Sequence, residues 1–138
     1  MTAIVQISEL HNEYRLQGTL DSLLIGPAAP KMRIYDDTGS PQMPALITDA
    51  ATGNLLVEVV LEDPVGTIDN GELAWAIPDD ALVMVTGDAF WAEFVDGNGD
   101  VNTRCTVTGV GGDGPIRLVE THLLAGSALR VAPGSKFR

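Results

Sequence analysis

The sequence predicts an all-β domain, an antiparallel β-sandwich or jelly-roll-like barrel with at most one short N-terminal helix. Hydrophobic residues recur with a period of two along many short segments, which is the spacing of strands with one buried face. Segments rich in Gly, Pro, Asp and Asn separate these strands, and such residues are typical of turns. With 138 residues, 45% of them hydrophobic, the chain has the size of one domain with its own core.

The N-terminal residues are the least regular part of the chain. Residues 1–18 are expected to form an arm or a first strand, with the strand at residues 3–8. From Glu9 to Leu24 the leucines can be arranged helically, but Gly18 interrupts the pattern. Thr19 is suited to start a separate short turn as its N-cap. This segment therefore stays open between a helix and irregular structure.

Residues 19–132 are expected to form a single β-sandwich domain. Strands are predicted at residues 32–36, 55–63, 71–77, 81–85, 115–120 and 127–131, each bounded by turn-forming residues. The polar residues 133–138 are expected to form a mobile tail.

The strongest single signal is a β-hairpin from Asp88 to Gly109. Two alternating segments flank a turn of Gly, Asp and Asn at residues 96–100, which is a common hairpin composition. The face of the hairpin that is predicted to fill the core carries Phe90, Phe94, Val101 and Cys105. We expect Cys105 to be a buried, unreactive thiol, and as the single cysteine it forms no disulfide within the chain.

The opposite strand faces are expected to contact other protein chains. Large apolar side chains on an outward face favour an interface over solvent. Trp75 is weighed as a core residue or an interface anchor, and Trp91 as the better interface anchor because it alternates with Glu93. The residues predicted for this interface are Trp91, Glu93, Leu56, Val60 and Trp75.

The charge balance argues against nucleic acid and membrane partners. Lys and Arg total 8 against 19 Asp and Glu, for a net charge of -11, and the cations are scattered. Such a chain repels phosphate backbones and anionic lipid surfaces. No segment approaches the ~20 apolar residues of a membrane span, and the N-terminus lacks a basic leader.

The patterns that suggest chemistry each have a structural explanation. Asp96, Asn98 and Asp100 have the spacing that opens a calcium loop, but Val101 and Val107 stand where that loop needs Gly and Glu. A hairpin turn explains these residues better. Two histidines, His11 and His122, are too few for a metal site by themselves. We therefore predict no metal and no cofactor.

Paired carboxylates and glycines are equally unspecific here. Adjacent acids could act as an acid and base pair in a small hydrolase, but a chain with 19 acids is expected to contain such pairs. The pairs are Asp36 with Asp37, Glu62 with Asp63, and Asp79 with Asp80. The loop with Gly111, Gly112 and Gly114 lacks the lysine of a phosphate-binding loop and precedes a strand. We predict no catalytic residues.

The order of the motifs resembles a group of small structural virion proteins of tailed bacteriophages and prophages. The resemblance runs from about Thr19 to Ala132, whereas residues 1–18 depart from the group. It is carried by MRIYD at residues 32–36, the apolar strand at 55–61, the small-residue strand at 71–77, AFWAEFVDGNG at 89–99, the turn at Thr108 and Gly109, and the ending pattern of Leu123, Gly126 and Val131. It implies a non-enzymatic protein present in several copies in the particle.

Two functions remain open from this resemblance. The first is a capsid decoration (cement) or minor capsid protein that binds the major capsid lattice as a homo-oligomer, for which a trimer is one option. Its location would be the virion, assembled in the cytoplasm of the bacterial host. The alternative is a tail- or neck-associated module that contacts a receptor or carbohydrate through an exposed tryptophan, Trp75 or Trp91.

Overall fold

The computed structural model describes residues 5–137, in which one helix precedes two β-sheets. The helix is α1 (Glu9–Leu23). The larger sheet has the order β2-β1-β5-β6-β7, with β8 paired to β5, and the smaller sheet has the order β3-β4-β9. The strands of the larger sheet are β1 (Lys31–Asp36), β2 (Leu55–Val60), β5 (Gly87–Val95), β6 (Val101–Gly109), β7 (Ile116–Leu118) and β8 (His122–Leu123). Those of the smaller sheet are β3 (Gly66–Asp69), β4 (Glu72–Trp75) and β9 (Lys136–Phe137).

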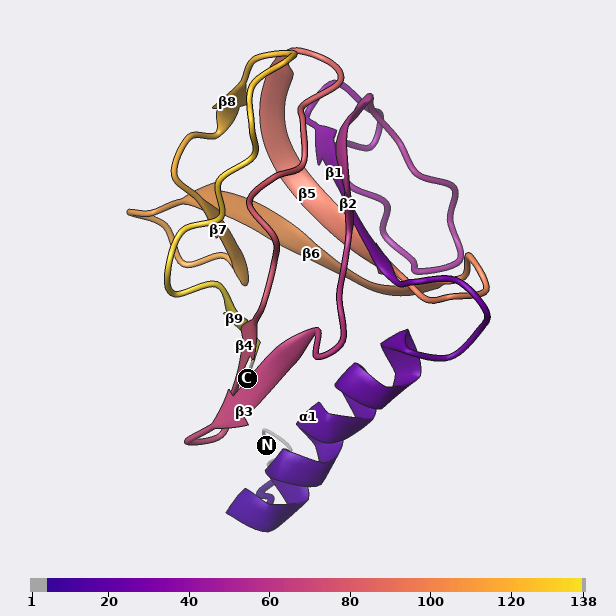
Figure 1. Cartoon of the computed structure of the whole chain (residues 1–138), viewed down its shortest axis with the longest axis vertical. Coiled ribbons are helices and arrows are strands. Elements are labelled where there is room, and N and C mark those ends of the chain that lie inside the picture. The colour runs from indigo at the N-terminus through magenta and orange to yellow at the C-terminus, as the bar shows by residue number, and fades with distance from the viewer. Residues whose placement is uncertain (1–4, 138) are drawn as a thin grey trace, which may run out of the picture.

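The larger sheet curls into a half-barrel, and the smaller sheet and α1 lie at one end of it (Figure 1). The predicted all-β class with a short N-terminal helix is therefore confirmed. The predicted hairpin is also present as β5 and β6, with Glu93 opposite Arg104. One strand pair differs from the expected antiparallel arrangement, because β6 and β7 are parallel. Gly112 and Gly114 pack against Thr108 there, which lets the chain turn back tightly after β6.

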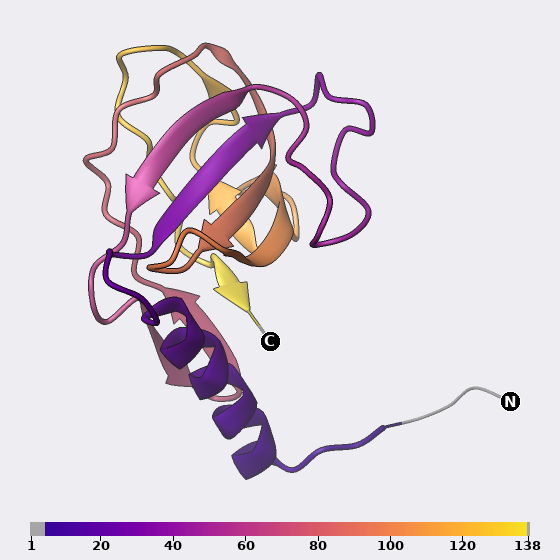
Figure 2. The same ribbon diagram turned by 90° about the vertical axis from the view of Figure 1, so that its right-hand side faces the viewer.

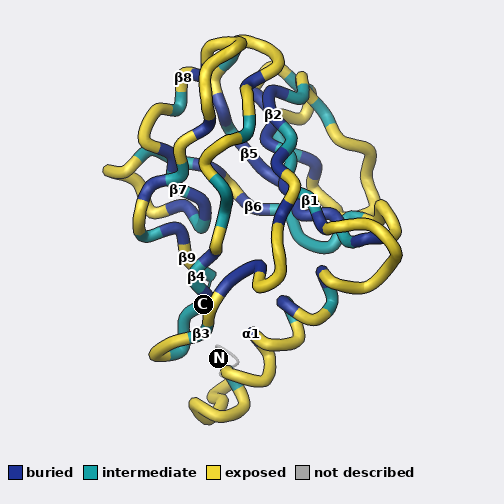
Figure 3. The backbone as a smooth tube through the Cα atoms, viewed as in Figure 1, coloured by how far each residue is buried: buried dark blue, intermediate teal, exposed yellow. Residues whose placement is uncertain are grey.

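The hydrophobic core lies inside the curl of the larger sheet and continues to the smaller sheet and the helix (Figure 3). The ring of Trp75 in β4 stacks on Phe94 in β5 with centroids 4.3 Å apart, and Phe137 meets Trp75 edge-on at 5.6 Å. Phe94 and Cys105 are buried as predicted, whereas Phe90 and Val101 are half-buried. The aromatic contacts join the two sheets into one core.

A single continuous helix replaces the predicted boundary at residue 18. The Ser8 hydroxyl caps its start by accepting a hydrogen bond from the backbone N–H of His11 (3.0 Å). Gly18 lies inside the helix at a cost of about 1 kcal/mol relative to alanine. Burial of Leu16, Leu20 and Leu23 against the core offsets that cost. Residues 5–8 do not form a strand, and the rest of the predicted first strand lies outside the described residues.

The C-terminal residues are ordered by the chain itself, so the predicted polar tail is wrong for residues 133–137. Strand β9 pairs with β4, with Phe137 opposite Leu73. Ser135 is buried, and its hydroxyl accepts a hydrogen bond from the backbone N–H of Arg117 (2.9 Å). Polarity alone misses this because the segment is held mainly through its backbone and one aromatic ring.

Two predicted strands are present as irregular paired segments instead of regular strands. Residues 81–85 and 127–131 run beside each other, joined by hydrogen bonds from the N–H of Val83 to the Ser127 carbonyl (2.9 Å) and from the N–H of Leu129 to the Ala81 carbonyl (2.8 Å). Val83 and Leu129 point into the core, whereas Leu82 is exposed. The predicted period-two alternation is thus only partly present, because Val85 is exposed, and the pairing is too short for a regular strand.

The turn between β5 and β6 holds the linker that follows the helix. The Gly97 N–H donates to the Ile25 carbonyl (2.8 Å), and the Ala28 N–H donates to the Gly97 carbonyl (3.2 Å). A Cβ atom at Gly97 would overlap the Ala28 carbonyl oxygen. The Asp96 carboxylate accepts the N–H groups of Asn98 and Asp100, so these polar residues shape a turn.

Replacing Gly97 with alanine should therefore destabilise the fold by about 1–3 kcal/mol, because the methyl group forces two backbone segments apart. Gly111→Ala is the matched control, since a Cβ atom there meets nothing within 4 Å. Its effect should stay within about 0.5 kcal/mol. Urea unfolding followed by tryptophan fluorescence measures both, and equal midpoints for the two variants would contradict the close packing at Gly97.

Candidate functional site

The outer face of the larger sheet carries a second buried cluster, separate from the main core. It consists of Tyr35 on β1, Trp91 and Glu93 on β5, and Arg104 on β6, and we call it the outer cluster. The rings of Tyr35 and Trp91 stack with centroids 4.3 Å apart and an interplanar angle of 9°. The Arg104 guanidinium carbon lies 5.4 Å from the centre of the Trp91 ring, a cation–π geometry.

The charged members of the outer cluster satisfy one another. One carboxylate oxygen of Glu93 accepts the Tyr35 hydroxyl (2.7 Å), and the other accepts Nε of Arg104 (3.2 Å). Nη1 of Arg104 donates to the Leu46 carbonyl in the long loop of residues 37–54 (2.9 Å). Burial and the adjacent Glu93 carboxylate raise the pKa of Tyr35 well above its usual range. Tyr35 therefore stays protonated and donates its hydrogen bond to Glu93, whereas the bond from Arg104 to Leu46 ties the loop to the sheet.

Four of the five residues predicted for an interface are buried within the chain. The predicted outward exposure of Leu56 and Trp91 is therefore wrong, and of the two roles weighed for Trp75 the structure has the core one. Trp91 and Glu93 belong to the outer cluster, and Trp75 fills the core against Phe94. Leu56 is covered by residues 84–87: its carbonyl accepts the N–H groups of residues 84 and 85, and its side chain reaches the backbone of residue 87. Val60, in contrast, is 54% exposed.

Asp36 fastens the two ends of the same loop. Its Oδ1 accepts the backbone N–H of Asn54 (2.9 Å) and the Thr38 hydroxyl (2.7 Å), and its Oδ2 accepts Nδ2 of Asn54 (3.0 Å). Burial alone raises the pKa of this carboxyl, but the hydrogen bonds from Asn54 and Thr38 outweigh it and hold the pKa below its usual value. The most buried member of the predicted acid pairs is therefore an ionised structural group.

The other predicted chemistry-bearing residues are dispersed. Asp79, Asp80, Glu62 and Asp63 are exposed. Nδ1 of His122 lies 2.8 Å from the Asp88 carboxylate, and both side chains are exposed. Burial raises the pKa of the Cys105 thiol to about 12. Within residues 5–137, no three His, Cys, Asp or Glu side chains are grouped as a metal site.

The first two turns of α1 project beyond the body of the protein (Figure 2). Leu10 is 60% exposed and Tyr14 is 70% exposed, and both line a shallow groove of about 320 Å³ with Ile68 of β3. Asn12 connects these turns to the body by a hydrogen bond from its Nδ2 to the Gly71 carbonyl (3.1 Å). We call Leu10, Tyr14 and Ile68 the helix groove.

Sequence reasoning missed the helix groove, although a signal for it exists. A helix turns by about 100° per residue, which places Leu10 and Tyr14 about 80–160° around α1 from the buried Leu16 and Leu20. Apolar side chains therefore extend beyond the buried face of α1, which indicates a contact there as well. Gly18 hides this signal, because a glycine in the middle of a helical pattern favours an interruption of the helix.

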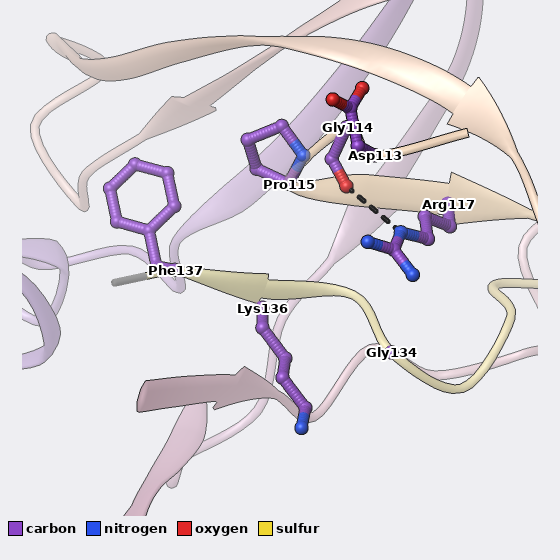
Figure 4. Close-up of a pocket in the computed structure, with 7 residues that line it drawn as sticks. All are labelled: Asp113, Gly114, Pro115, Arg117, Gly134, Lys136 and Phe137. Atoms are coloured by element: carbon purple, nitrogen blue, oxygen red, sulfur yellow. Dashed lines mark hydrogen bonds between the residues drawn. The ribbon is translucent and has the colours of Figure 1, made fainter. Parts of the chain in front are cut away.

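A second concave feature lies between β7 and the C-terminal strand β9. It has a volume of about 560 Å³ and is lined by Asp113, Gly114, Pro115, Arg117, Gly134, Lys136 and Phe137 (Figure 4). The sequence predicts none of these residues as a site. Arg117 of β7 meets Gly134, Lys136 and Phe137 only when β9 pairs with β4.

Comparisons with known proteins and the search for membrane-spanning helices add no assignment to these surfaces. No protein-family model, curated protein or solved structure matches the chain. Among residues 5–137, no helix has the length and apolar character needed to cross a membrane.

Asp36→Asn should lower the free energy of unfolding by about 1–3 kcal/mol near neutral pH, because an amide presents a donor to Asn54 and Thr38. The folded-state pKa of Asp36 is lower than the unfolded-state value, so its stabilisation is complete above the usual value of 3.8 and is lost as pH falls through the folded pKa. The difference in the free energy of unfolding between wild type and Asp36→Asn should therefore become smaller at acidic pH. Urea unfolding between about pH 7 and about pH 3 measures it, with the exposed Asp37→Asn as control. A gap that does not change with pH would contradict this role.

Trp91→Ala should destabilise the protein by about 3–5 kcal/mol, because it removes a fully buried ring from the outer cluster. Val60→Ala, at the exposed position of the same predicted interface, should change stability by at most about 0.5 kcal/mol. Thermal unfolding of the two variants tests the reassignment of Trp91 from interface to interior. Similar small effects for both would restore Trp91 as a surface residue.

Proposed function

We propose that this protein is a non-enzymatic structural component of a tailed-phage virion, a capsid decoration or minor capsid protein that binds the major capsid lattice as a homo-oligomer. The phage assignment is supported by the order of motifs from Thr19 to Ala132. The assembly role is supported by one structural observation, the helix groove on the projecting half of α1, where the exposed Leu10 and Tyr14 stand beside Glu13 and Gln17.

The projecting turns of α1 need support from outside the chain. Isolated helices of fewer than ~12–15 residues are marginal in water, and packing of an apolar face usually supplies their stability. Within residues 9–15, every residue except Asn12 is exposed, so the chain itself supplies little packing there. An external contact on Leu10 and Tyr14 would stabilise these turns and remove apolar surface from water.

A second copy of the chain is the occupant that the surface favours. Residues 5–8 lead away from the body, and they carry Val5, which is 88% exposed, and Ile7, which is 41% exposed (Figure 2). The chain thus presents an apolar arm and, next to it, an apolar groove that this arm does not line. Exchange of arms between copies would fill both, in a closed dimer or a ring.

The interior chemistry is consistent with a structural role. Glu93 and Arg104 are paired with each other and buried, with 2% and 6% of their side chains exposed. Asp36 is occupied by Asn54 and Thr38. These charged groups hold the long loop on the sheet, which is a use of buried charge for specificity of structure.

The charge of the chain fits a particle component that meets protein and not nucleic acid or membrane. A net charge of -11 keeps the free protein soluble and repels phosphate-rich partners. We accordingly assign its location to the virion, after assembly in the host cytoplasm.

The alternative function is a tail or neck module that binds a receptor or carbohydrate through an exposed tryptophan. The structure has no exposed tryptophan among residues 5–137. Trp91 is fully buried and Trp75 is 9% exposed, so neither ring is available for stacking on a sugar. A carbohydrate platform needs an accessible aromatic face.

Sedimentation analysis of the Leu10→Ser/Tyr14→Ser double variant tests the copy-to-copy contact. Wild type should sediment as an oligomer and the double variant as a monomer, with at least about tenfold weaker association, because truncated interface anchors typically cost more than about 1 kcal/mol. Leu82→Ser/Leu124→Ser removes two similarly exposed apolar side chains elsewhere and should leave the oligomer intact.

Cosedimentation with capsids that lack the protein completes this test. Wild type should bind them, and a monodisperse monomer at high concentration that also fails to bind capsids would overturn the proposed function. Circular dichroism of each variant excludes unfolding as the cause of lost association.

A further inference from the structure

The pocket between β7 and β9 contains a partly buried arginine with open hydrogen-bonding capacity. Arg117 lies in the middle of β7, and its Nε donates to the Gly114 carbonyl (3.3 Å). That bond leaves the four N–H groups of Nη1 and Nη2 without a partner in residues 5–137. Figure 4 shows the guanidinium beside the pocket, with Pro115 and Phe137 also on its lining.

The position of the Arg117 side chain is set by the backbone around it. The Arg117 carbonyl accepts the Ala132 N–H (2.7 Å), which fixes the strand against the C-terminal segment. Gly134 lies against the guanidinium, and a Cβ atom there would approach Nη1 to 3.3 Å. The absence of a side chain at Gly134 therefore keeps this side of the guanidinium open. A guanidinium held in this way loses less rotamer freedom when it binds a planar anion.

Among residues 5–137, Arg117 also differs from the ion-paired cations in having no acidic partner. Within residues 5–137, Lys31 and Arg33 pair with Glu58, Arg104 pairs with Glu93, and Lys136 pairs with Glu72. Among the residues that the structure describes, no carboxylate lies within 4.0 Å of the Arg117 nitrogens, although Asp113 lines the same pocket. Lys136 also lines the pocket, but its side chain runs away from Arg117 in Figure 4 and its Nζ lies 3.0 Å from the Glu72 carboxylate.

We propose that this pocket binds a carboxylate attached to an apolar group, with Nη1 and Nη2 of Arg117 donating to its two oxygens. The fork of a guanidinium matches a carboxylate in bidentate geometry. Phe137 and Pro115 supply an apolar wall for the group that carries the carboxylate. The ligand is either a free organic acid or the C-terminal carboxylate of a polypeptide, and both offer the same chemistry to Arg117.

The net charge of -11 repels every anionic ligand, so binding must be measured where salt screens that repulsion. Long-range repulsion opposes any anion, but charges more than ~8 Å away are largely screened at about 0.15 M salt. Binding that persists at that ionic strength therefore reports the contacts inside the pocket. The Asp113 carboxylate lines the same pocket and repels an anion there, so Asp113→Asn should tighten binding.

Amide NMR titration at that salt concentration, with benzoate and with a short peptide ending in Phe as free acid or as amide, measures the binding. We expect saturable shifts confined to residues 113–117 and 134–137, and at least about tenfold weaker binding in Arg117→Gln, as for loss of a charged hydrogen-bond pair. Arg130→Gln is the matched control, because Arg130 is exposed and its substitution removes the same charge at a position outside the pocket. Binding of benzoate assigns a free acid, whereas binding of the free-acid peptide alone assigns a polypeptide C-terminus; either result supports the site.

Three results would overturn the proposal: no saturable shift with either probe, equal affinity of the acid and amide peptides, or equal weakening by Arg117→Gln and Arg130→Gln. Arg117→Lys keeps the charge without the fork, so full affinity in that variant would also overturn the bidentate contact. Arg117→Lys also replaces Arg117→Gln as the test variant if Arg117→Gln does not fold. Poor dispersion of the NMR spectrum of Arg117→Gln would reveal that failure.

Discussion

Strand β5 is buried on both faces, and each face holds a different part of the chain against the larger sheet. On the inner face, Phe94 stacks on Trp75 and so joins the smaller sheet to the larger one. On the outer face, Trp91 and Glu93 hold Tyr35 and Arg104, and through Arg104 the long loop. Because β5 is covered on both faces, its polar Glu93 is buried and depends on the hydrogen bonds that Tyr35 and Arg104 supply.

The loops act as structural elements in this arrangement. The ionised Asp36 closes the ends of residues 37–54 through Asn54, and the turn at Gly97 accepts the linker that follows α1. Acidic and glycine-rich segments of this kind look like sites when they are seen as sequence. Here their oxygens and their small size are used to satisfy backbone N–H groups and to let backbones approach.

The surfaces left for partners lie away from β5. The helix groove exposes apolar side chains where α1 extends beyond the body, whereas the Arg117 pocket offers an open guanidinium next to the C-terminal strand. The first suits a broad protein contact driven by burial of apolar area, and the second suits one directed charged group. The two proposals are independent, because they involve opposite chemical preferences and share no residue.

The sequence by itself determined the all-β class, the hairpin of β5 and β6, and the strands at residues 32–36 and 71–77, because alternation with a period of two is a local property of the chain. It also indicated that Asp96, Asn98 and Asp100 form a turn. Only the tertiary structure decided which strand faces are covered. Tyr35 and Arg104, the latter bonded to Leu46 of the long loop, lie against Trp91, and β9 converts a polar tail into a wall of the Arg117 pocket. Coverage depends on contacts between distant segments, and local periodicity carries no information about them.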